Sequence, residues 1–95
     1  MGQSVGRAVS FQLDQTVMTR GISTMVGEGF DAAALIKRHA EGDWGDLGAE
    51  DTQANNEALK VGGRLFSSYE TPEGKVWVIT EADRSSTCVL LPSEY

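Results

Sequence analysis

The last third of the chain constrains the fold most, because turn-forming residues divide it into segments rich in β-branched and aromatic side chains. The first two segments, Arg64–Glu70 and Lys75–Glu81, flank Thr71–Gly74, where Pro followed two positions later by Gly is typical of a β-hairpin loop. After a second turn comes Thr87–Leu91, which Pro92 ends because proline cannot donate a ladder hydrogen bond. This pattern predicts a three-stranded antiparallel meander.

The middle of the chain predicts two helices. The first begins after Asp31, a suitable N-cap, and Gly42 is a natural residue to follow its end. Its buried side is expected to comprise Ala32, Leu35, Ile36 and His39. The second helix runs from about Ala49 to Val61, because acidic residues occupy its first turn and the Gly62–Gly63 pair stops it. Its buried side is expected to comprise Ala54, Ala58, Leu59 and Val61.

Upstream of these helices, apolar and polar residues alternate over Ser10–Arg20, which is typical of a half-buried strand. Glycines punctuate the following stretch, so any helix across Ser23–Val26 should be limited to a turn or two. Residues 1–95 are therefore expected to form a single α+β domain. Its core is a small antiparallel sheet of about four strands, with two or three short helices packed on one face.

Composition limits the partners of this domain. The chain has 95 residues and a net charge of −6, from eight Lys plus Arg against fourteen Asp plus Glu. Binding nucleic acid or an anionic membrane requires a basic surface, so neither partner is expected. The N-terminal stretch lacks the apolar core of a signal peptide, and no apolar run is long enough to span a bilayer. Cys88, the single cysteine, is expected to pack as a small apolar residue. Because one cysteine cannot form an internal disulfide, a reducing, cytoplasmic location is expected.

Motifs that carry chemistry are missing. Phosphate-binding glycine loops, dinucleotide fingerprints and nucleophile elbows do not occur, so we expect no enzyme activity and no cofactor.

His39, the only imidazole, could act as a general base with a carboxylate from the Glu41–Asp46 loop. In the last turn of a helix, however, its simpler role is to offset the helix dipole. Acidic residues between 43 and 51 offer oxygen ligands, but their spacing departs from that of a calcium-binding loop, so no metal is expected. A small enzyme, or a ligand- or metal-binding domain, built on His39 and this loop is the alternative hypothesis.

The distribution of charge is the most informative functional feature. Residues 41–59, here called the acidic segment, contain six carboxylates and no Lys or Arg, and they account for the whole net charge of −6. The segment is either a solvated face that keeps the domain in solution or a surface that attracts a cationic partner. The residues expected to contact such a partner are Glu41, Asp43, Trp44, Asp46, Glu50, Asp51 and Glu57. Trp44 is either an exposed contact or a core anchor, and the gain from burying a large aromatic side chain favours the anchor.

Three stretches of the chain are similar to known proteins: RHAEGDWGDLGAEDTQANNEAL (Arg38–Leu59), GGRLFSSYETPEGKVWVITEADRSSTCVLLPSEY (Gly62–Tyr95) and, more faintly, Val17–Gly21. They resemble a family of small bacterial proteins encoded on plasmids and other mobile elements. The shared motifs are RH-x-x-GDWGDL and ITE-x-DRS-x-T-x-x-LLP-x-EY. The family has no established activity, and although some members carry a label taken from type I restriction enzymes, no methyltransferase or nuclease motif occurs here. Mobile elements carry small proteins that inhibit host defences, including CRISPR and restriction complexes, which bind nucleic acid through channels lined by Lys and Arg.

We therefore expect a non-enzymatic, small acidic binding protein whose partner is a protein with a Lys/Arg-rich surface. The resemblance implies a more specific role as an inhibitor of a host defence nuclease complex, acting through the acidic segment. Whether an exposed sheet edge also pairs two copies into a homodimer stays open at this level.

Overall fold

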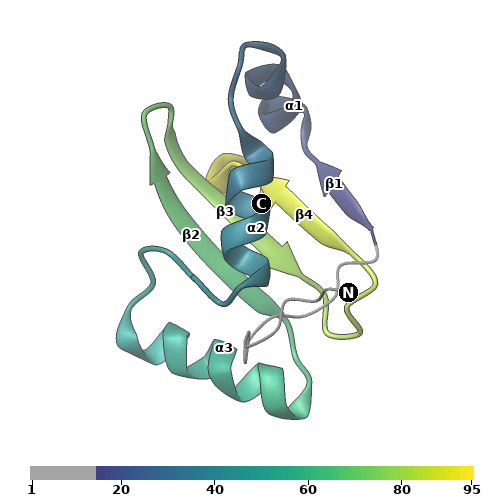
Figure 1. The fold of residues 1–95 in the computed structure, drawn as a ribbon, viewed down its shortest axis with the longest axis vertical. Helices are drawn as coiled ribbons and strands as arrows, with labels where there is room; N and C mark the ends of the chain where they lie inside the picture. Colours follow the sequence, from purple (N-terminus) through teal and green to yellow (C-terminus); the bar gives the residue numbers. More distant parts are fainter. Residues whose placement is uncertain (1–14) are drawn as a thin grey trace, which may run out of the picture.

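The computed structural model describes residues 15–95, which fold into a four-stranded sheet, three α-helices and a final 3₁₀ turn (Figure 1). The α+β class and the small sheet predicted from the sequence are confirmed. Within the described range, no helix is long and apolar enough to cross a membrane. In chain order the elements are β1 (Thr16–Met18), α1 (Arg20–Gly27), α2 (Ala32–Ala40), α3 (Ala49–Val61), β2 (Leu65–Thr71), β3 (Gly74–Thr80), β4 (Thr87–Leu90) and η1 (Pro92–Glu94).

The predicted meander of β2, β3 and β4 forms the larger part of the sheet, in which the strand order is β1-β4-β3-β2. β2 and β3 pair antiparallel as far as Thr71, which lies opposite Gly74, and β4 pairs antiparallel with β3. The hairpin loop is therefore shorter than expected, because only Pro72 and Glu73 lie outside the ladder. The Thr71 hydroxyl stabilises this loop: it donates to the Gly74 carbonyl and accepts the Glu73 N–H.

The first strand corrects the predicted antiparallel sheet. Of the strand expected over Ser10–Arg20, Ser10–Asp14 lies outside the described residues, and β1 itself comprises only three residues. β1 pairs parallel with β4, where Val17 lies opposite Cys88, so the sheet is mixed. The physical reason is connectivity, since no hairpin joins β1 to β4 and the long intervening chain allows either direction.

α1 starts at Arg20, where the first strand was expected to end, and it extends beyond the expected Ser23–Val26 on both sides, to eight residues or about two turns. Gly21 lies in its first turn, where the side chains of Leu91 and Glu94 in the C-terminal segment approach closely and would have to shift to admit a Cβ. An added Cβ would lie 2.7 Å from Leu91 Cδ1 and 2.8 Å from Glu94 Oε2. The Glu94 carboxylate accepts the Gly21 N–H at 2.8 Å and thereby satisfies one of the unpaired donors at the start of the helix.

The two faces of the sheet are covered differently. α1 and α2 pack on one face and form the main core with it, whereas the other face carries η1 and no α-helix of the described chain (Figure 1). The buried side chains of this main core are Ile22, Ala32, Leu35, Tyr69, Val76, Val78 and Val89. A smaller core cluster of Trp44, Ala58 and Leu65 lies under α3.

Tyr69 and Trp77 are large aromatic residues on the two strands of the hairpin, but they lie on opposite faces of the sheet and do not pair across it. Tyr69 lies opposite Val76 in the ladder and is 1% exposed, in the main core. Trp77 is one position further along β3, and a one-residue step along a strand moves a side chain to the other face of the sheet. There Trp77 packs edge-on against Phe66 and Tyr95, with ring centroids 5.0 and 5.7 Å away.

α2 has the predicted ends, and its buried side is as predicted except that Ile36 is only partly buried. The Asp31 side chain accepts the Ala34 N–H at 3.2 Å, as expected of an N-cap. Gly42 follows the helix with a φ of 85°, a conformation that favours glycine. Lys37, Arg38 and His39 occupy the last turn, where positive charge is favourable, and His39 also faces the core.

α3 has the predicted range but only part of the predicted buried side. Ala58 is buried, whereas Ala54 is exposed and Val61 is 72% exposed. The other buried residue of α3 is Asn55, whose amide donates to the Phe66 carbonyl at 2.6 Å and accepts the Phe66 N–H at 3.1 Å. α3 therefore meets β2 through a polar contact, and hydrophobic periodicity cannot reveal a contact of this kind.

Candidate functional site

The structure divides the acidic segment into a paired part and an exposed part. In the paired part, the Arg38 guanidinium donates to both oxygens of Asp43 at 2.7 and 3.3 Å, and Lys37 lies 2.8 Å from Glu41. The hydrogen bonds between Arg38 and Asp43 hold the pKa of Asp43 below its usual value and that of Arg38 above it. Cations from the last turn of α2 thus balance two of the six carboxylates, although those cations lie outside residues 41–59.

Asp43 and Trp44 organise the loop between α2 and α3. The Asp43 carbonyl accepts the Tyr69 hydroxyl at 2.6 Å, and burial raises the pKa of Tyr69 to about 12. The Trp44 side chain is only 5% exposed; its ring packs edge-on 5.6 Å from that of His39, and its Nε1 donates to Asn56 at 3.3 Å. Trp44 is therefore a core anchor, as expected, and little of its side chain is left to contact a partner.

Gly45 brings this loop against the free edge of β2. The Ser68 N–H donates to the Trp44 carbonyl at 3.1 Å, and the Asp46 N–H donates to the Ser68 carbonyl at 2.6 Å. Gly45 has a φ of 77°, and an added Cβ would lie 2.1 Å from the Ser68 oxygen, so only glycine fits. The loop thus covers part of an edge that would otherwise offer unpaired backbone groups to another chain.

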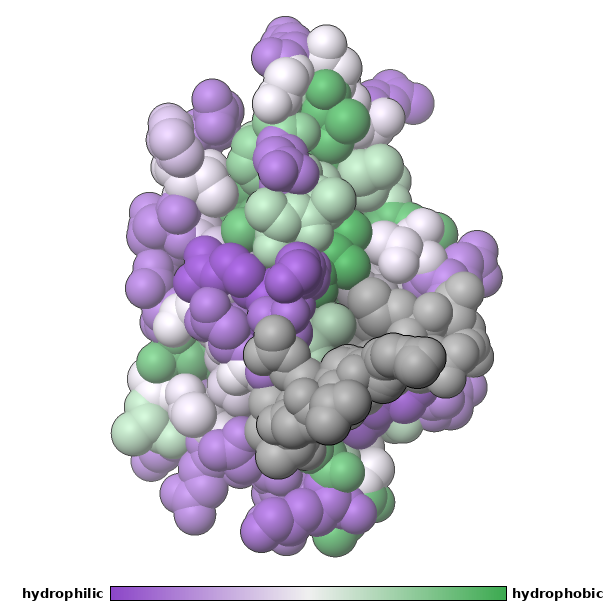
Figure 2. Space-filling view, viewed as in Figure 1, coloured by the Kyte–Doolittle hydropathy of each residue, from purple (hydrophilic) through white to green (hydrophobic). Residues whose placement is uncertain are grey.

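The exposed part of the acidic segment is here called the acidic face and consists of Asp46, Glu50, Asp51 and Glu57. Within residues 15–95, none of these four carboxylates forms an ion pair. Glu50 and Glu57 are two helical turns apart, so they project from the same side of α3, while Asn55 and Ala58 face inward. Figure 2 shows hydrophilic residues over α3 at the lower end of the molecule. The acidic face is therefore a negative surface open to solvent.

His39 lies in a buried polar network between α2 and the sheet. The imidazole is fully buried, with Nδ1 2.5 Å from Ser67 Oγ and Nε2 2.8 Å from Thr80 Oγ1, which in turn lies 2.7 Å from Thr87 Oγ1. Burial lowers the pKa of His39 to about 4, and the positive charge of Arg84 lowers it further, so the ring is neutral at pH 7. Both ring nitrogens are engaged with hydroxyls, and the ring has no exposed surface.

Metal-ligating side chains are dispersed in the part of the chain that the structure describes. Between residues 15 and 95, no three His, Cys, Asp or Glu side chains lie together in a way that could hold a metal ion. Cys88 is half-buried on the sheet face opposite the α-helices, and burial raises the pKa of its thiol. The thiol is therefore protonated at pH 7, which agrees with its expected role as a small packing residue.

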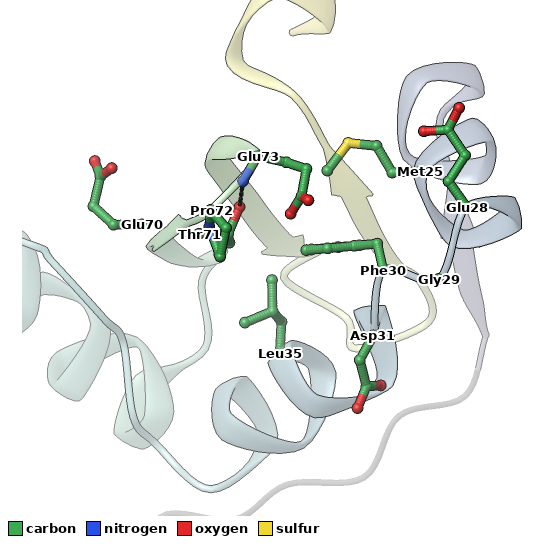
Figure 3. Close-up of a pocket in the computed structure, with 10 residues that line it drawn as sticks. All are labelled: Met25, Glu28, Gly29, Phe30, Asp31, Leu35, Glu70, Thr71, Pro72 and Glu73. Atoms are coloured by element: carbon green, nitrogen blue, oxygen red, sulfur yellow. Dashed lines mark hydrogen bonds between the residues drawn. The ribbon is translucent and has the colours of Figure 1, made fainter.

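A cleft of about 430 Å³ lies at the other end of the molecule from α3, between the corner joining α1 to α2 and the hairpin of β2 and β3 (Figures 1 and 3). Its volume is within the range of about 300–1,000 Å³ that is common for ligand sites. Its two walls come from distant parts of the chain, so no sequence motif predicts it. The cleft is lined by the apolar residues Met25, Phe30, Leu35 and Pro72, the acidic residues Glu28, Asp31, Glu70 and Glu73, and Gly29 and Thr71.

Comparisons of the chain with protein-family models, with curated proteins and with solved structures find no significant match. The acidic face, the buried network around His39 and the cleft are therefore the features from which function can be inferred.

Proposed function

We propose that this protein is a non-enzymatic acidic binding protein that docks on a Lys/Arg-rich protein surface through its acidic face. The observation that supports this is the exposure of four carboxylates with no ion pair to another residue of the range 15–95. Like charges gathered on one helix and the adjoining loop attract a basic partner over a Debye length of about 8–10 Å. Because the carboxylates stay hydrated until docking, their main effect is on the association rate.

We further propose that the partner is a host defence nuclease complex of the CRISPR or restriction type, and that the protein inhibits it. The support is the resemblance of Arg38–Leu59 and Gly62–Tyr95 to proteins of mobile elements, which carry inhibitors of such complexes. The channels of these complexes bind nucleic-acid phosphates with Lys and Arg. A small acidic protein that occupies such a channel competes with the phosphates. Because these complexes act in the cytoplasm, the inhibitor acts there as well.

The alternative hypothesis, an active or ligand site built on His39 and the Glu41–Asp46 loop, gains no support from the geometry. The imidazole is held by Ser67 and Thr80 inside the core, and Asp43 is occupied by Arg38. A general base has to reach the proton that it abstracts, directly or through one water molecule, and both nitrogens of this fully buried ring are engaged with the hydroxyls of Ser67 and Thr80.

The proposal is tested with a fourfold variant, Asp46→Asn/Glu50→Gln/Asp51→Asn/Glu57→Gln. Nucleic-acid cleavage by purified CRISPR and restriction complexes is measured with and without the protein, over a series of salt concentrations. We expect inhibition of at least one complex, weaker inhibition at high salt, and slower association of the fourfold variant with a flatter salt dependence. Each substitution at an exposed position should change stability by less than about 0.5 kcal/mol, except near the start of α3, where Asp51 also favours the helix dipole.

A matched pair of single variants separates position from charge. Glu57→Gln and Glu81→Gln each remove one exposed carboxylate, but Glu57 belongs to the acidic face and Glu81 pairs with Arg64 at 3.5 Å elsewhere. Only Glu57→Gln should slow association. If the fourfold variant inhibits at the wild-type rate and with the wild-type salt dependence, the acidic face only keeps the protein in solution; if no complex is inhibited, the proposed partner class is wrong.

A further inference from the structure

The cleft beside the β2–β3 hairpin combines an apolar floor with a carboxylate that points into it. In Figure 3, Met25, Phe30 and Leu35 point across the cleft toward Pro72, and the Glu73 carboxylate extends into the same space. Met25 and Phe30 pack on the main core but are only partly buried. The floor therefore leaves apolar surface in contact with water at a site that is concave and large enough for a side chain.

The rim of this cleft carries an excess of negative charge. Glu28 and Glu73 form no ion pair with any residue of the range 15–95. Glu70 is balanced by Lys75 at 3.2 Å, and the Asp31 carboxylate accepts a backbone N–H as the N-cap of α2. The apolar floor is thus complemented best by a ligand whose apolar part ends in a positive charge.

We propose that this cleft binds a single Lys or Arg side chain of a protein partner. The aliphatic stem of that side chain lies on Met25, Phe30 and Leu35, and its cationic head meets the Glu73 carboxylate. Long basic side chains combine an apolar stem with a charged end in this way. A purely apolar side chain would leave Glu73 without a partner, and a small cation would leave the floor in water. The cleft lies at the other end of the molecule from the acidic face, so this inference does not depend on the proposed function (Figure 1).

The test is a titration of the ¹⁵N-labelled full chain with blocked tripeptides that carry Arg or Lys between two glycines. We expect saturable shifts of the backbone amides of Gly29, Phe30, Glu73 and Gly74. Two matched peptides identify the chemistry: one with citrulline, which keeps the shape of Arg without its charge, and one with the guanidinium on a stem shortened by two methylenes. Both should bind more weakly than the Arg peptide, the first because it lacks the charge and the second because it loses contact with the floor.

Variants of the protein complete the test. Glu73→Gln should weaken binding of the Arg peptide about two- to fivefold, the effect of losing one partly exposed ion pair. Glu57→Gln removes the same charge from the acidic face and should leave the affinity unchanged. Glu73 is exposed at a hairpin tip, so its substitution is compatible with the fold. Equal binding of the Arg and citrulline peptides, equal effects of the two variants, or shifts confined to residues 46–57 would each overturn the proposal.

Discussion

At the scale of single residues, burial separates the side chains that hold the fold from those that are open to a partner. Trp44 and Asp43 belong to one acidic motif, yet the first is a core anchor and the second is bonded to Arg38. Glu57, in contrast, is exposed. A carboxylate that already has a good partner gains little from a second cation, so the exposed residues are the better candidates for binding.

Replacing Trp44 by Ala should destabilise the protein strongly. The substitution removes an indole that is 5% exposed, along with its hydrogen bond to Asn56, and leaves a cavity between α3 and the sheet. The expected loss in the free energy of unfolding is about 3–5 kcal/mol, measured by urea denaturation. Val61→Ala, at a position 72% exposed, is the control and should change stability little. Unchanged stability of Trp44→Ala with lost partner binding would show that Trp44 is a contact residue.

His39 should make stability fall in mildly acidic solution. The pKa of this buried imidazole is about 4 in the folded protein and about 6.5 in the unfolded chain, so the unfolded chain binds more protons between these values. The contribution of the neutral, buried His39 to the free energy of unfolding is complete above pH 6.5. It is lost as the pH falls toward 4, which lowers the free energy of unfolding by about 3 kcal/mol at most. Below that range the carboxylates with lowered pKa values, such as Asp43, lose their stabilising bonds in turn.

Two measurements check this pH dependence. Urea denaturation at several pH values should give a free energy of unfolding that declines from pH 7 to pH 4. Because His39 is the only histidine, its ring resonances in NMR spectra are unambiguous and report its pKa directly. A ring that titrates near pH 6.5 in the folded protein would contradict the buried, neutral state described above.

At the scale of elements, polar contacts attach α3 to the rest of the molecule alongside its small apolar cluster. Asn55 binds both backbone groups of Phe66 in β2. At the C-terminal end of α3, the Arg84 guanidinium donates to the carbonyls of Ala58 and Gly63 at 3.0 and 2.6 Å. Arg84 reaches them from the turn between β3 and β4, where it has a φ of 66°. These contacts fix the helix, and with it the acidic face, relative to the sheet.

Asn55→Ala should therefore lower the free energy of unfolding more than its small change in side-chain volume implies. It leaves the N–H and the carbonyl of Phe66 without their side-chain partner, and an unsatisfied buried polar group costs about 1–3 kcal/mol. Hydrogen exchange should show faster exchange of the Phe66 amide, together with a lower free energy of unfolding. Gln53→Ala, at an exposed position on the same helix, is the control. Equal behaviour of the two variants would mean that the Asn55 contact contributes nothing.

At the scale of the whole molecule, the last residues of the chain hold the start of the first helix. The Glu94 carboxylate accepts hydrogen bonds from the Thr19 hydroxyl and from the N–H groups of Gly21 and Leu91, the last two at 2.8 and 3.0 Å. The residues joined by the Gly21 contact are 73 positions apart in the chain. These bonds, led by that from Thr19, lower the pKa of Glu94, so the carboxylate stays charged in its capping role.

Glu94→Gln should weaken the hydrogen bonds that join the C-terminal segment to the start of α1. The neutral amide accepts hydrogen bonds more weakly and places an N–H₂ group where donors already converge. We expect a lower Tm and faster hydrogen exchange of the Gly21 amide, with less change in the meander of β2, β3 and β4. Ser93→Ala, at the neighbouring exposed position, should behave as the wild type. If exchange at Gly21 is the same in both variants, Glu94 does not hold α1.

The sequence by itself determined the local structure of this protein. Asp31 as a helix cap, Gly42 after α2 and Gly62–Gly63 after α3 are as predicted, because each depends on backbone preferences within a few residues. The hairpin turn is at its predicted place, although its loop is shorter than expected. The meander followed from the same turn-forming residues, whereas the burial of Trp44 was expected because a large aromatic side chain gains from leaving water. What local patterns could not give was the outcome of contacts between distant segments.

Only the tertiary structure decided the direction of β1, the burial of Asn55 and the accessibility of the acidic segment. β1 and β4 pair parallel although most of the chain separates them in sequence. Asn55 is buried where α3 meets β2, and its amide forms a hydrogen bond with Phe66 there. The cleft is formed only when the α1–α2 corner meets the hairpin tip. The physical reason is common to all of them: packing and charge pairing depend on distances in space, whereas caps and turns depend on residues adjacent in the chain.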